Sequence, residues 1–295
     1  MLHDLARQTR PRLWTERIDA RDTHDVDRLP NGNLVVANMR NYDRERGVSD
    51  DRVFVYDRET DEVVWEWTIR EHFPNDTDGG FRPDWSHVND VDAVEGGDAF
   101  LISLRNFDQV VKVDRETKRI EWRLGRDEAH DTLFEQHNPD LLATDPPTVL
   151  VADSENDRVL EYARRDGEWV RTWTLSGDLS WPRDADRLPN GNTLVTDTLN
   201  HRVIEVTPEG RVVWEYYATW GPYDAERIGT GDGSNGPTIA AMNATGRYTV
   251  SGGGSGARLG RVTPAEWVRL RAAGTPVAGP VTDLATRWSH VAPWV

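Results

Sequence analysis

HDVDRLPNGNLVVAN (24–38) and RDADRLPNGNTLVTD (183–197) are nearly the same sequence, and they occur in one chain of 295 residues. Each contains an apolar run, a Pro-Asn-Gly-Asn turn and a second apolar run. An Asn-Gly pair between two such runs is a strong signal for a β-hairpin. Similarity within one chain indicates a repeat architecture, which has to be interpreted before any local motif.

Two further strands are predicted after each hairpin. The third is RVFVYD (52–57) in one copy and RVIEVT (202–207) in the other, and the fourth is EVVWEWTI (62–69) or RVVWEYY (211–217). Two more copies lie between them, beginning at NDVDAVEGGDAFLISLR (89–105) and HNPDLLATDPPTVLVADS (137–154). Units of four short strands that recur at roughly 40–45 residues are typical of propeller blades, which must stack to bury their faces.

The predicted fold is therefore an all-β propeller with four clear four-stranded blades. Strands around GRYTVSG (246–252) suggest an incomplete fifth or sixth blade. We assign residues 1–262 to the propeller and residues 263–295 to a helical or irregular tail, because the Thr-Pro-Ala-Glu run at 263–266 is typical of a helix start. Tryptophans of the fourth strands should pack between blades: Trp65, Trp67, Trp122, Trp173 and Trp214.

The composition excludes several classes of function. With 51 acidic and 35 basic residues the formal net charge is −16, which disfavours nucleic acid and anionic membrane surfaces as partners. Lys112 and Lys118 are the only lysines, and the acidic surplus suggests a halophilic protein. No cysteine is present, so disulfides and thiolate chemistry are excluded. We see no membrane span and no signal peptide, and expect membrane contact only through missing termini.

Aligning the copies on the aspartate of the first strand places four polar residues at one repeat position: His24, Asn89, His137 and Arg183. The first strand of a blade lines the central channel, so these side chains should converge. His87 lies two residues before Asn89, and strand alternation would direct it to the same side.

Arg105 follows the second strand of the same copy and should lie near the same channel mouth. We therefore predict an electropositive pocket in an acidic protein, suited to a sulfate, phosphate or carboxylate group. Two other interpretations stay open. The histidines could satisfy hydrogen bonds between blades, or three of them could bind zinc, although neighbouring arginines would repel a metal ion. We predict no metal and no cofactor.

Three stretches resemble the blade motifs of arylsulfate sulfotransferases, which move a sulfuryl group between phenolic esters without a nucleotide. They are THDVDRLPNGNLVV (23–36), DWSHVNDVDAV (84–94) and LFEQHNPD (133–140), and Arg105 follows His87 at the family's spacing of eighteen positions. ENDRVLEY (155–162) and WPRDADRLPNGNTLVTD (181–197) are similar to a haloarchaeal branch of sequences that resemble arylsulfotransferases.

The resemblance implies that His137 is the nucleophile that is transiently sulfated. It also implies that His24, His87 and Arg105 hold the sulfuryl oxygens, and that Asn89 belongs to the same motif. Arg183 is assigned to substrate binding from the repeat alignment alone. The family's enzymes are longer, with six blades and an additional N-terminal domain.

The predicted function is an arylsulfate sulfotransferase-like transferase. Its partners would be a small aryl sulfate and a phenol, with a sulfohistidine intermediate. The alternatives are a non-catalytic propeller that binds an anionic ligand or a protein partner, and a metal-dependent hydrolase or lyase. The resemblance favours an extracytoplasmic or cell-surface location, while the donor, the acceptor and the oligomeric state are left open.

Overall fold

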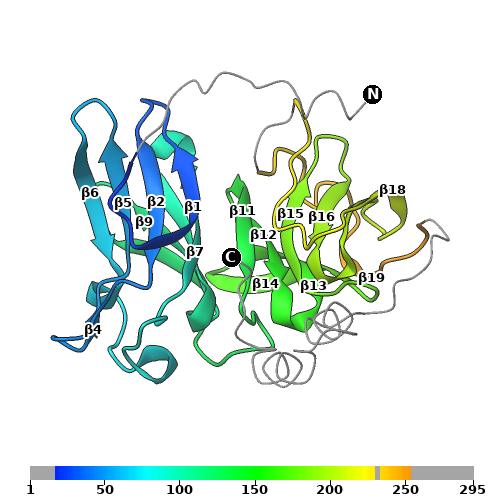
Figure 1. Cartoon of the computed structure of the whole chain (residues 1–295). Coiled ribbons are helices and arrows are strands. Elements are labelled where there is room, and N and C mark those ends of the chain that lie inside the picture. The colour runs from blue at the N-terminus through cyan, green and yellow to red at the C-terminus, as the bar shows by residue number, and fades with distance from the viewer. Residues whose placement is uncertain (1–16, 230–232, 254–295) are drawn as a thin grey trace, which may run out of the picture.

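The computed structural model describes residues 17–229 and 233–253, which form four β-sheets arranged as propeller blades (Figure 1). Blade one has the strand order β1-β2-β5-β6, and the other blades also run sequentially from their first strand. Their bounds are as follows: blade one, β1 (Asp22–Arg28), β2 (Leu34–Met39), β5 (Arg52–Asp57), β6 (Glu62–Thr68); blade two, β7 (Val88–Val94), β8 (Ala99–Leu104), β9 (Gln109–Asp114), β10 (Ile120–Gly125); blade three, β11 (His137–Thr144), β12 (Pro147–Asp153), β13 (Arg158–Arg165), β14 (Glu168–Ser176); blade four, β15 (Pro182–Arg187), β16 (Thr193–Asp197), β17 (Arg202–Val206), β18 (Val212–Tyr217). The prediction of four four-stranded blades is confirmed.

The first strands lie against one another in blade order. β1 contacts β7, β7 contacts β11, and β11 contacts β15, so these strands form the inner wall of the propeller. Carboxylates join neighbouring strands of this wall. Asp25 accepts a hydrogen bond from the Val91 N–H at 3.0 Å, and Asp27 accepts one from the Ala93 N–H at 2.9 Å. Aspartates of the repeat therefore satisfy the backbone donors that an inner strand leaves unpaired.

The Asn-Gly turns form the two hairpins that the sequence predicts. In blade one the Leu29 N–H bonds the Asn33 carbonyl at 2.9 Å, and in blade four the Leu188 N–H bonds the Asn192 carbonyl at 2.9 Å. Within each Pro-Asn-Gly-Asn turn, the glycine is the one residue with a positive φ angle, which is 91° at Gly32 and 85° at Gly191. A glycine is needed there because a side chain would strain this conformation.

Apolar side chains fill the spaces between consecutive blades. Trp67 is 1% exposed and donates its indole N–H to the Lys118 carbonyl of blade two at 3.2 Å. Trp173 is fully buried and donates to the Pro208 carbonyl of blade four at 2.8 Å. Trp65 and Trp122 likewise contact the following blade, through Phe100 and Trp169. The predicted packing role is confirmed for these four residues.

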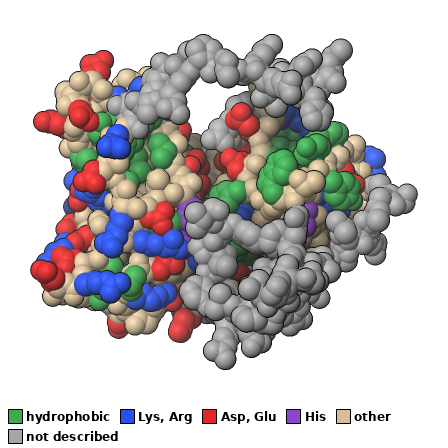
Figure 2. Space-filling view, viewed as in Figure 1, with side chains coloured by type: hydrophobic (Ala, Val, Ile, Leu, Met, Phe, Trp, Pro, Cys, Tyr) green, Lys and Arg blue, Asp and Glu red, His purple; other side chains and the backbone are tan. Residues whose placement is uncertain are grey.

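Trp214 is the exception, because 44% of its surface is exposed. It lies on β18, and no blade follows blade four in the described part of the chain. Its neighbours Tyr216 and Trp220 are 49% and 61% exposed, and hydrophobic side chains gather over blade four in Figure 2. The prediction that Trp214 packs between blades is therefore wrong.

The Trp173→Ala variant is expected to lose about 3–5 kcal/mol of unfolding free energy, because a large buried side chain leaves a cavity that its surroundings fill only partly. Urea unfolding followed by fluorescence would measure the loss. Trp214→Ala is the matched control and should change stability by less than about 1 kcal/mol, as expected for a largely exposed residue. Equal losses in the two variants would contradict the assigned packing.

The predicted incomplete fifth blade is not formed by the residues described. Instead, β19 (Gly246–Thr249) pairs in parallel with β14 and becomes a fifth strand of blade three. Gly210 and Gly177 lie against Thr249, and Val250 joins the apolar core between blades three and four. This segment therefore fills an existing outer edge, which buries more of its surface than an isolated strand could.

Shorter elements lie between the strands of the blades. The polar insertion after β2 forms a small hairpin of β3 (Tyr42–Asp43) and β4 (Val48–Ser49). Six 3-10 turns are described: η2 (Ile69–Glu71), η3 (Thr77–Gly79), η4 (Glu95–Gly97), η5 (Arg105–Phe107), η6 (Ser154–Asn156) and η7 (Thr198–Asn200). In the described ranges no helix has the length and apolarity needed to cross a membrane. The predicted tail, 263–295, lies outside the described residues.

Candidate functional site

A β-bulge interrupts every first strand close to the aligned polar residue. The paired register skips from Thr23 to Asp25, from Val88 to Asp90 and from Pro182 to Asp184. The extra residues at these bulges are His24, Asn89 and Arg183. In β11 the bulge comes just after His137, which stays paired with Ala152. Because a bulge redirects the side chain of its extra residue, blades one, two and four orient their site residues in the same way, whereas His137 lies just before its bulge.

A second shared feature lies two residues earlier in blades two to four. His87, Glu135 and Trp181 have positive φ angles of 44°, 47° and 53°. Such values are uncommon for residues other than glycine, and they cluster at functional sites in proteins. His87 therefore precedes β7 in a bent backbone, so the strand alternation we expected is not what orients it.

Aromatic rings bring the site residues together. The His24 and His87 rings stack with centroids 5.3 Å apart, and the Tyr223 ring also stacks on His24, with centroids 5.9 Å apart. His137 meets Tyr223 edge to face at 6.1 Å and meets Trp181 in the same way at 6.2 Å. The three predicted histidines therefore lie in one cluster, with Tyr223 between His24 and His137.

The hydrogen bonds of His137 define its tautomer. Its Nδ1 lies 2.8 Å from Ser154 Oγ and 3.1 Å from the Glu135 carbonyl oxygen. Ser154 already donates its only hydrogen to the Pro182 carbonyl at 2.6 Å, and a carbonyl oxygen can only accept. Nδ1 must therefore carry the hydrogen, which leaves the lone pair of neutral His137 on Nε2.

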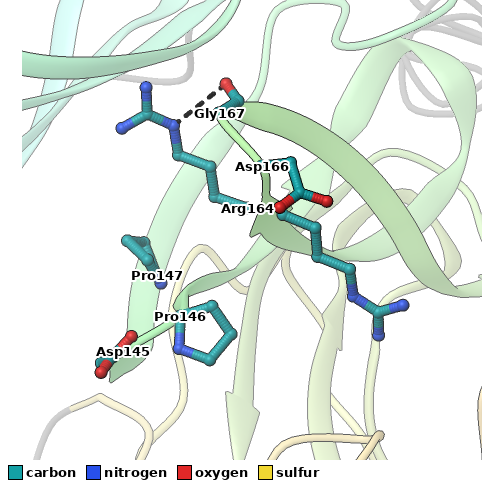
Figure 3. A pocket seen from close by; sticks show the side chains of 7 residues that line it. Asp145, Pro146, Pro147, Arg164, Asp166 and Gly167 are labelled. Atoms are coloured by element: carbon teal, nitrogen blue, oxygen red, sulfur yellow. Dashed lines mark hydrogen bonds between the residues drawn. The ribbon is translucent and has the colours of Figure 1, made fainter.

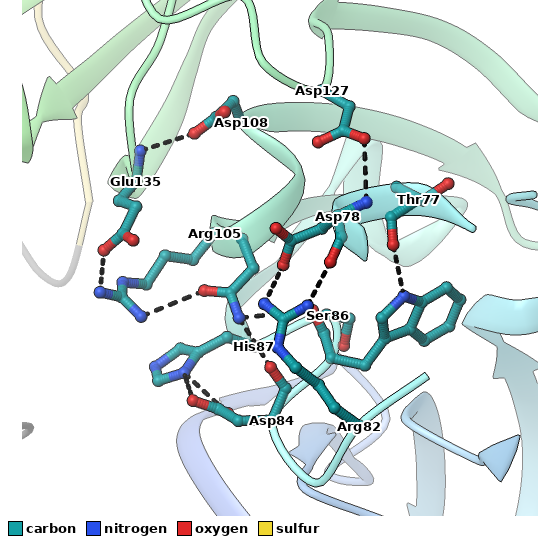
Figure 4. A network of polar contacts seen from close by, with 12 residues as sticks. Thr77, Asp78, Arg82, Asp84, Ser86, His87, Arg105, Asp108, Asp127 and Glu135 are labelled. Carbon is teal, nitrogen blue, oxygen red and sulfur yellow. Dashed lines mark hydrogen bonds and ion pairs between the residues drawn. The ribbon is translucent and has the colours of Figure 1, made fainter. Parts of the chain in front are cut away.

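Asp84 holds the second histidine (Figure 4). Its two carboxylate oxygens each lie 3.0 Å from His87 Nδ1, and Arg40 donates to the same carboxylate at 3.2 Å. Burial acts to raise the pKa of Asp84, but the hydrogen bond and the neighbouring charges outweigh it and hold that pKa below its usual range. Asp84 is therefore ionised and fixes the His87 ring with Nε2 directed away from the carboxylate.

The two site arginines have different surroundings. Arg105 is largely buried and forms an ion pair with Glu135, as Figure 4 shows. Arg183 forms no ion pair with a carboxylate in the described ranges. Its guanidinium lies between two aromatic faces, with Cζ 3.8 Å from the Trp181 centroid and 4.6 Å from that of Tyr223. Arg183 is therefore the cation most available to an anionic ligand.

Asn89 partly supports the interpretation that polar site residues form hydrogen bonds between neighbouring blades. Its Nδ2 donates to the Gln136 carbonyl at 3.0 Å, across the junction of blades two and three. Its Oδ1 is buried and has no partner in the part of the chain that the structure describes. Other buried atoms of the cluster that lack a hydrogen bond of normal geometry are His24 Nε2, Arg105 Nε, Arg183 Nε and Tyr223 Oη. Because buried polar atoms are nearly always paired in proteins, this gathering indicates a place for a polar ligand.

Burial and the nearby arginines keep the histidines neutral. Burial lowers the pKa of His137 well below its usual value, and the charges of Arg183 and Arg105 add to the effect. Burial also lowers the pKa of His24, and it lowers that of His87 to about 4. Burial lowers the pKa of Arg183 to about 10 and raises that of Tyr223 to about 12. At neutral pH the positive charge of the site therefore belongs to the arginines.

Two other surface features clarify the location of the cluster. A depression at the turns of blade three is lined by Asp145, Pro146 and Arg164, at the opposite end of β11 from His137 (Figure 3). An apolar groove on blade four is lined by Trp214, Trp220 and Tyr223 among others. Tyr223 belongs to both this groove and the histidine cluster, so aromatic surface leads directly to the candidate site.

No group of three His, Cys, Asp or Glu side chains in the described ranges is arranged to hold a metal ion. The zinc interpretation of His24, His87 and His137 therefore finds no support in their geometry. Arg105 and Arg183 lie close enough to lower the pKa of His137, and they would repel a metal ion at the same place.

Sequence reasoning missed several neighbours of the cluster. Arg40, Arg105, Ser154 and Thr198 each follow the second strand of a blade, so alignment at this position could have found Ser154. Asp84 lies within the same motif as His87, so the motif could have identified it as a neighbour of the site. Tyr223 lies in an irregular segment after β18 that has no counterpart in the other blades, and no sequence signal would have found it.

One family model matches the part of the chain that contains the five motif residues. A model of the arylsulfotransferase (ASST) family matches residues 12–144, somewhat under half of the chain. This segment is therefore similar to the arylsulfotransferase family. It includes His24, His87, Asn89, Arg105 and His137. Arg183 and Tyr223 lie beyond the arylsulfotransferase match, and no curated protein matches the chain.

Solved structures resemble the chain at the level of the fold. They include a streptogramin B lyase (9% identity, TM-score 0.48) and a hydrazine synthase of Kuenenia stuttgartiensis (16%, 0.46). A third is the periplasmic gluconolactonase PpgL of Pseudomonas aeruginosa (18%, 0.45). The alignments cover 69%, 68% and 68% of this chain and 57%, 51% and 55% of those proteins. This chain therefore spans little more than half of the length of these structures.

Proposed function

We propose that this protein transfers a sulfuryl group from an aryl sulfate ester to a phenol, with His137 as the nucleophile. The observation that carries the proposal is the hydrogen bonding of His137, which leaves the lone pair on Nε2 of a buried, neutral imidazole. A neutral imidazole nitrogen is both a good nucleophile and a good leaving group, so it divides one difficult transfer into two easier steps.

In the first step Nε2 of His137 attacks sulfur, and the bond from sulfur to the phenolic oxygen breaks. The phenolate leaves with the electron pair of that bond and takes up a proton. In the second step a phenol attacks the sulfur, its proton passes to a nearby base, and the electron pair returns to Nε2. His24 and His87 are neutral and adjacent, so either can accept or return this proton.

Arg183 and Arg105 supply the positive charge for the sulfuryl oxygens. Fixed cations in a largely buried site stabilise developing charge more strongly than the same groups in water. The apolar groove that ends at Tyr223 fits an aromatic ester, because a planar ring can pack on Trp214 and Trp220. Anionic and aromatic recognition therefore occur side by side, as an aryl sulfate requires.

The proposal can be tested by incubating the protein in high salt with a panel of aryl sulfates and a phenol acceptor. Chromatographic detection of the sulfated acceptor would support it. If donors bind without turnover, and binding is lost in Arg105→Ala, the protein is a non-catalytic propeller that recognises an anion.

The pH dependence of kcat/KM follows from the site's pKa values. Because neutral His137 is the reactive form and its pKa is lowered, we expect no loss of activity as the pH falls through 6.5. Activity should fall only at more acidic pH, where His137 becomes protonated. It should fall again near pH 10, where Arg183 loses its charge. Initial rates at constant ionic strength would measure this profile, and an acid limb centred at pH 6.5 or above would contradict it.

A further inference from the structure

Tyr223 places a phenol inside the cluster. Its ring is nearly parallel to that of His24, with 6° between the planes, and it meets the His137 ring at 79°. The Arg183 guanidinium lies over its face at 4.6 Å. A phenol is also the acceptor of the reaction proposed above, so the protein holds one of its own side chains where that class of molecule would react.

The two ends of this side chain lie in different surroundings. The ring lines the apolar groove of blade four, with Trp214 and Trp220, and is only partly buried. The hydroxyl is buried beside Arg183, which affects its pKa, but among the described residues it has no hydrogen bond of normal geometry. His24 Nε2, on the adjacent stacked ring, is likewise buried and unpaired. Structural tyrosines usually find a partner for a buried hydroxyl, so a purely structural role leaves this arrangement unexplained.

We propose that Tyr223 is an internal sulfuryl acceptor, which becomes a tyrosine O-sulfate when an aryl sulfate is supplied without an external phenol. This inference rests on the proposed function, because the sulfuryl group first has to reach His137. It adds a covalent modification site to a residue outside the segment that matches the family.

The transfer balances without any further reactant. The Tyr223 oxygen attacks the sulfur of sulfated His137, and a bond from sulfur to Oη forms as the bond from sulfur to Nε2 breaks. The electron pair of the broken bond returns to Nε2. The phenolic proton passes to the neutral imidazole of His24, and Arg183 stabilises the oxygen as it loses that proton. His137 is then free to react with a second donor molecule.

The test follows from this second reaction. The whole protein is mixed with excess para-nitrophenyl sulfate and no acceptor, and the burst of para-nitrophenol is measured. We expect about two molecules of nitrophenol per protein in the wild type and about one in Tyr223→Phe, because only the wild type can pass its first sulfuryl group on. Tyr223→Phe keeps the ring contacts and removes the oxygen. Tyr217→Phe, on exposed β18 but outside the lining of the groove, is the matched control and should keep the wild-type burst.

Peptide mass spectrometry locates the group. We expect a mass gain of one SO₃ on the peptide that contains Tyr223, absent in Tyr223→Phe and in His137→Ala. A burst of one molecule, with SO₃ on His137 alone and normal transfer to added phenol, would overturn this inference and leave the proposed function standing. The absence of any burst, together with no transfer to phenol, would overturn both.

Discussion

The His137→Ala variant is expected to lose sulfuryl transfer by about 10³-fold or more, because removal of a covalent nucleophile abolishes the two-step route and leaves only the binding contributions of the site. Transfer from an aryl sulfate to a phenol would be followed by the rate of sulfated product at saturating donor. The loss should appear in kcat and kcat/KM alike, since donor recognition by Arg183 and the aromatic groove remains.

His130→Ala is the matched control for this substitution. The His130 ring stacks on Phe134 near the same segment but is about half exposed and is not part of the cluster. Because His137 is buried, thermal unfolding should be compared in the two variants so that loss of folding is not mistaken for loss of the nucleophile. Partial restoration of activity by added imidazole would support the assignment. Unchanged turnover in a folded His137→Ala protein would contradict it.

The Arg183→Met variant should lose about 10²-fold in kcat/KM for an aryl sulfate. A charge-assisted hydrogen bond to the anion contributes roughly 1.5–3 kcal/mol, and each 1.4 kcal/mol is a factor of ten. The effect should be seen mainly as a higher KM, because Arg183 already faces the ligand before reaction. Methionine keeps the volume between Trp181 and Tyr223 and removes only the charge and its hydrogen bonds.

Stability should change in the opposite direction to activity. Arg183 is buried without a carboxylate partner among the described residues, so the unliganded protein pays a desolvation penalty that methionine removes. We expect Arg183→Met to unfold at an equal or higher urea concentration than the wild type. Arg126→Met, an exposed change outside the cluster, should leave both properties unchanged. Lower stability together with normal kinetics would instead assign Arg183 a packing role.

Most of the blade architecture could be predicted because it is encoded locally. The Asn-Gly turns, the apolar runs and the recurring tryptophans fix each hairpin with short-range interactions. The outer edge of blade three could not be predicted in the same way. β19 pairs with a strand about seventy positions earlier in the chain, and such a non-local choice depends on which edges the finished blades leave open.

The candidate site was likewise predictable from the sequence only in part. Repeat alignment and the family motifs selected His24, His87, Asn89, Arg105, His137 and Arg183, and the structure brings the three histidines and both arginines into one cluster. The sequence does not reveal how deeply a side chain is buried, so it could not indicate that burial lowers the pKa values of His24 and His87. The same applies to Arg105, whose charge is partly offset by Glu135.

The sequence by itself determined the repeat, and with it the blades and the position in each first strand where polar residues converge. Tertiary structure alone decided three properties of the site: the hydrogen on His137 Nδ1, the placement of the Arg183 guanidinium between two aromatic rings, and the presence of Tyr223 among the histidines. Periodicity and turn chemistry depend on neighbours along the chain. Tautomers, ion pairs and desolvation depend instead on distances between segments that are remote in sequence, which only folding establishes.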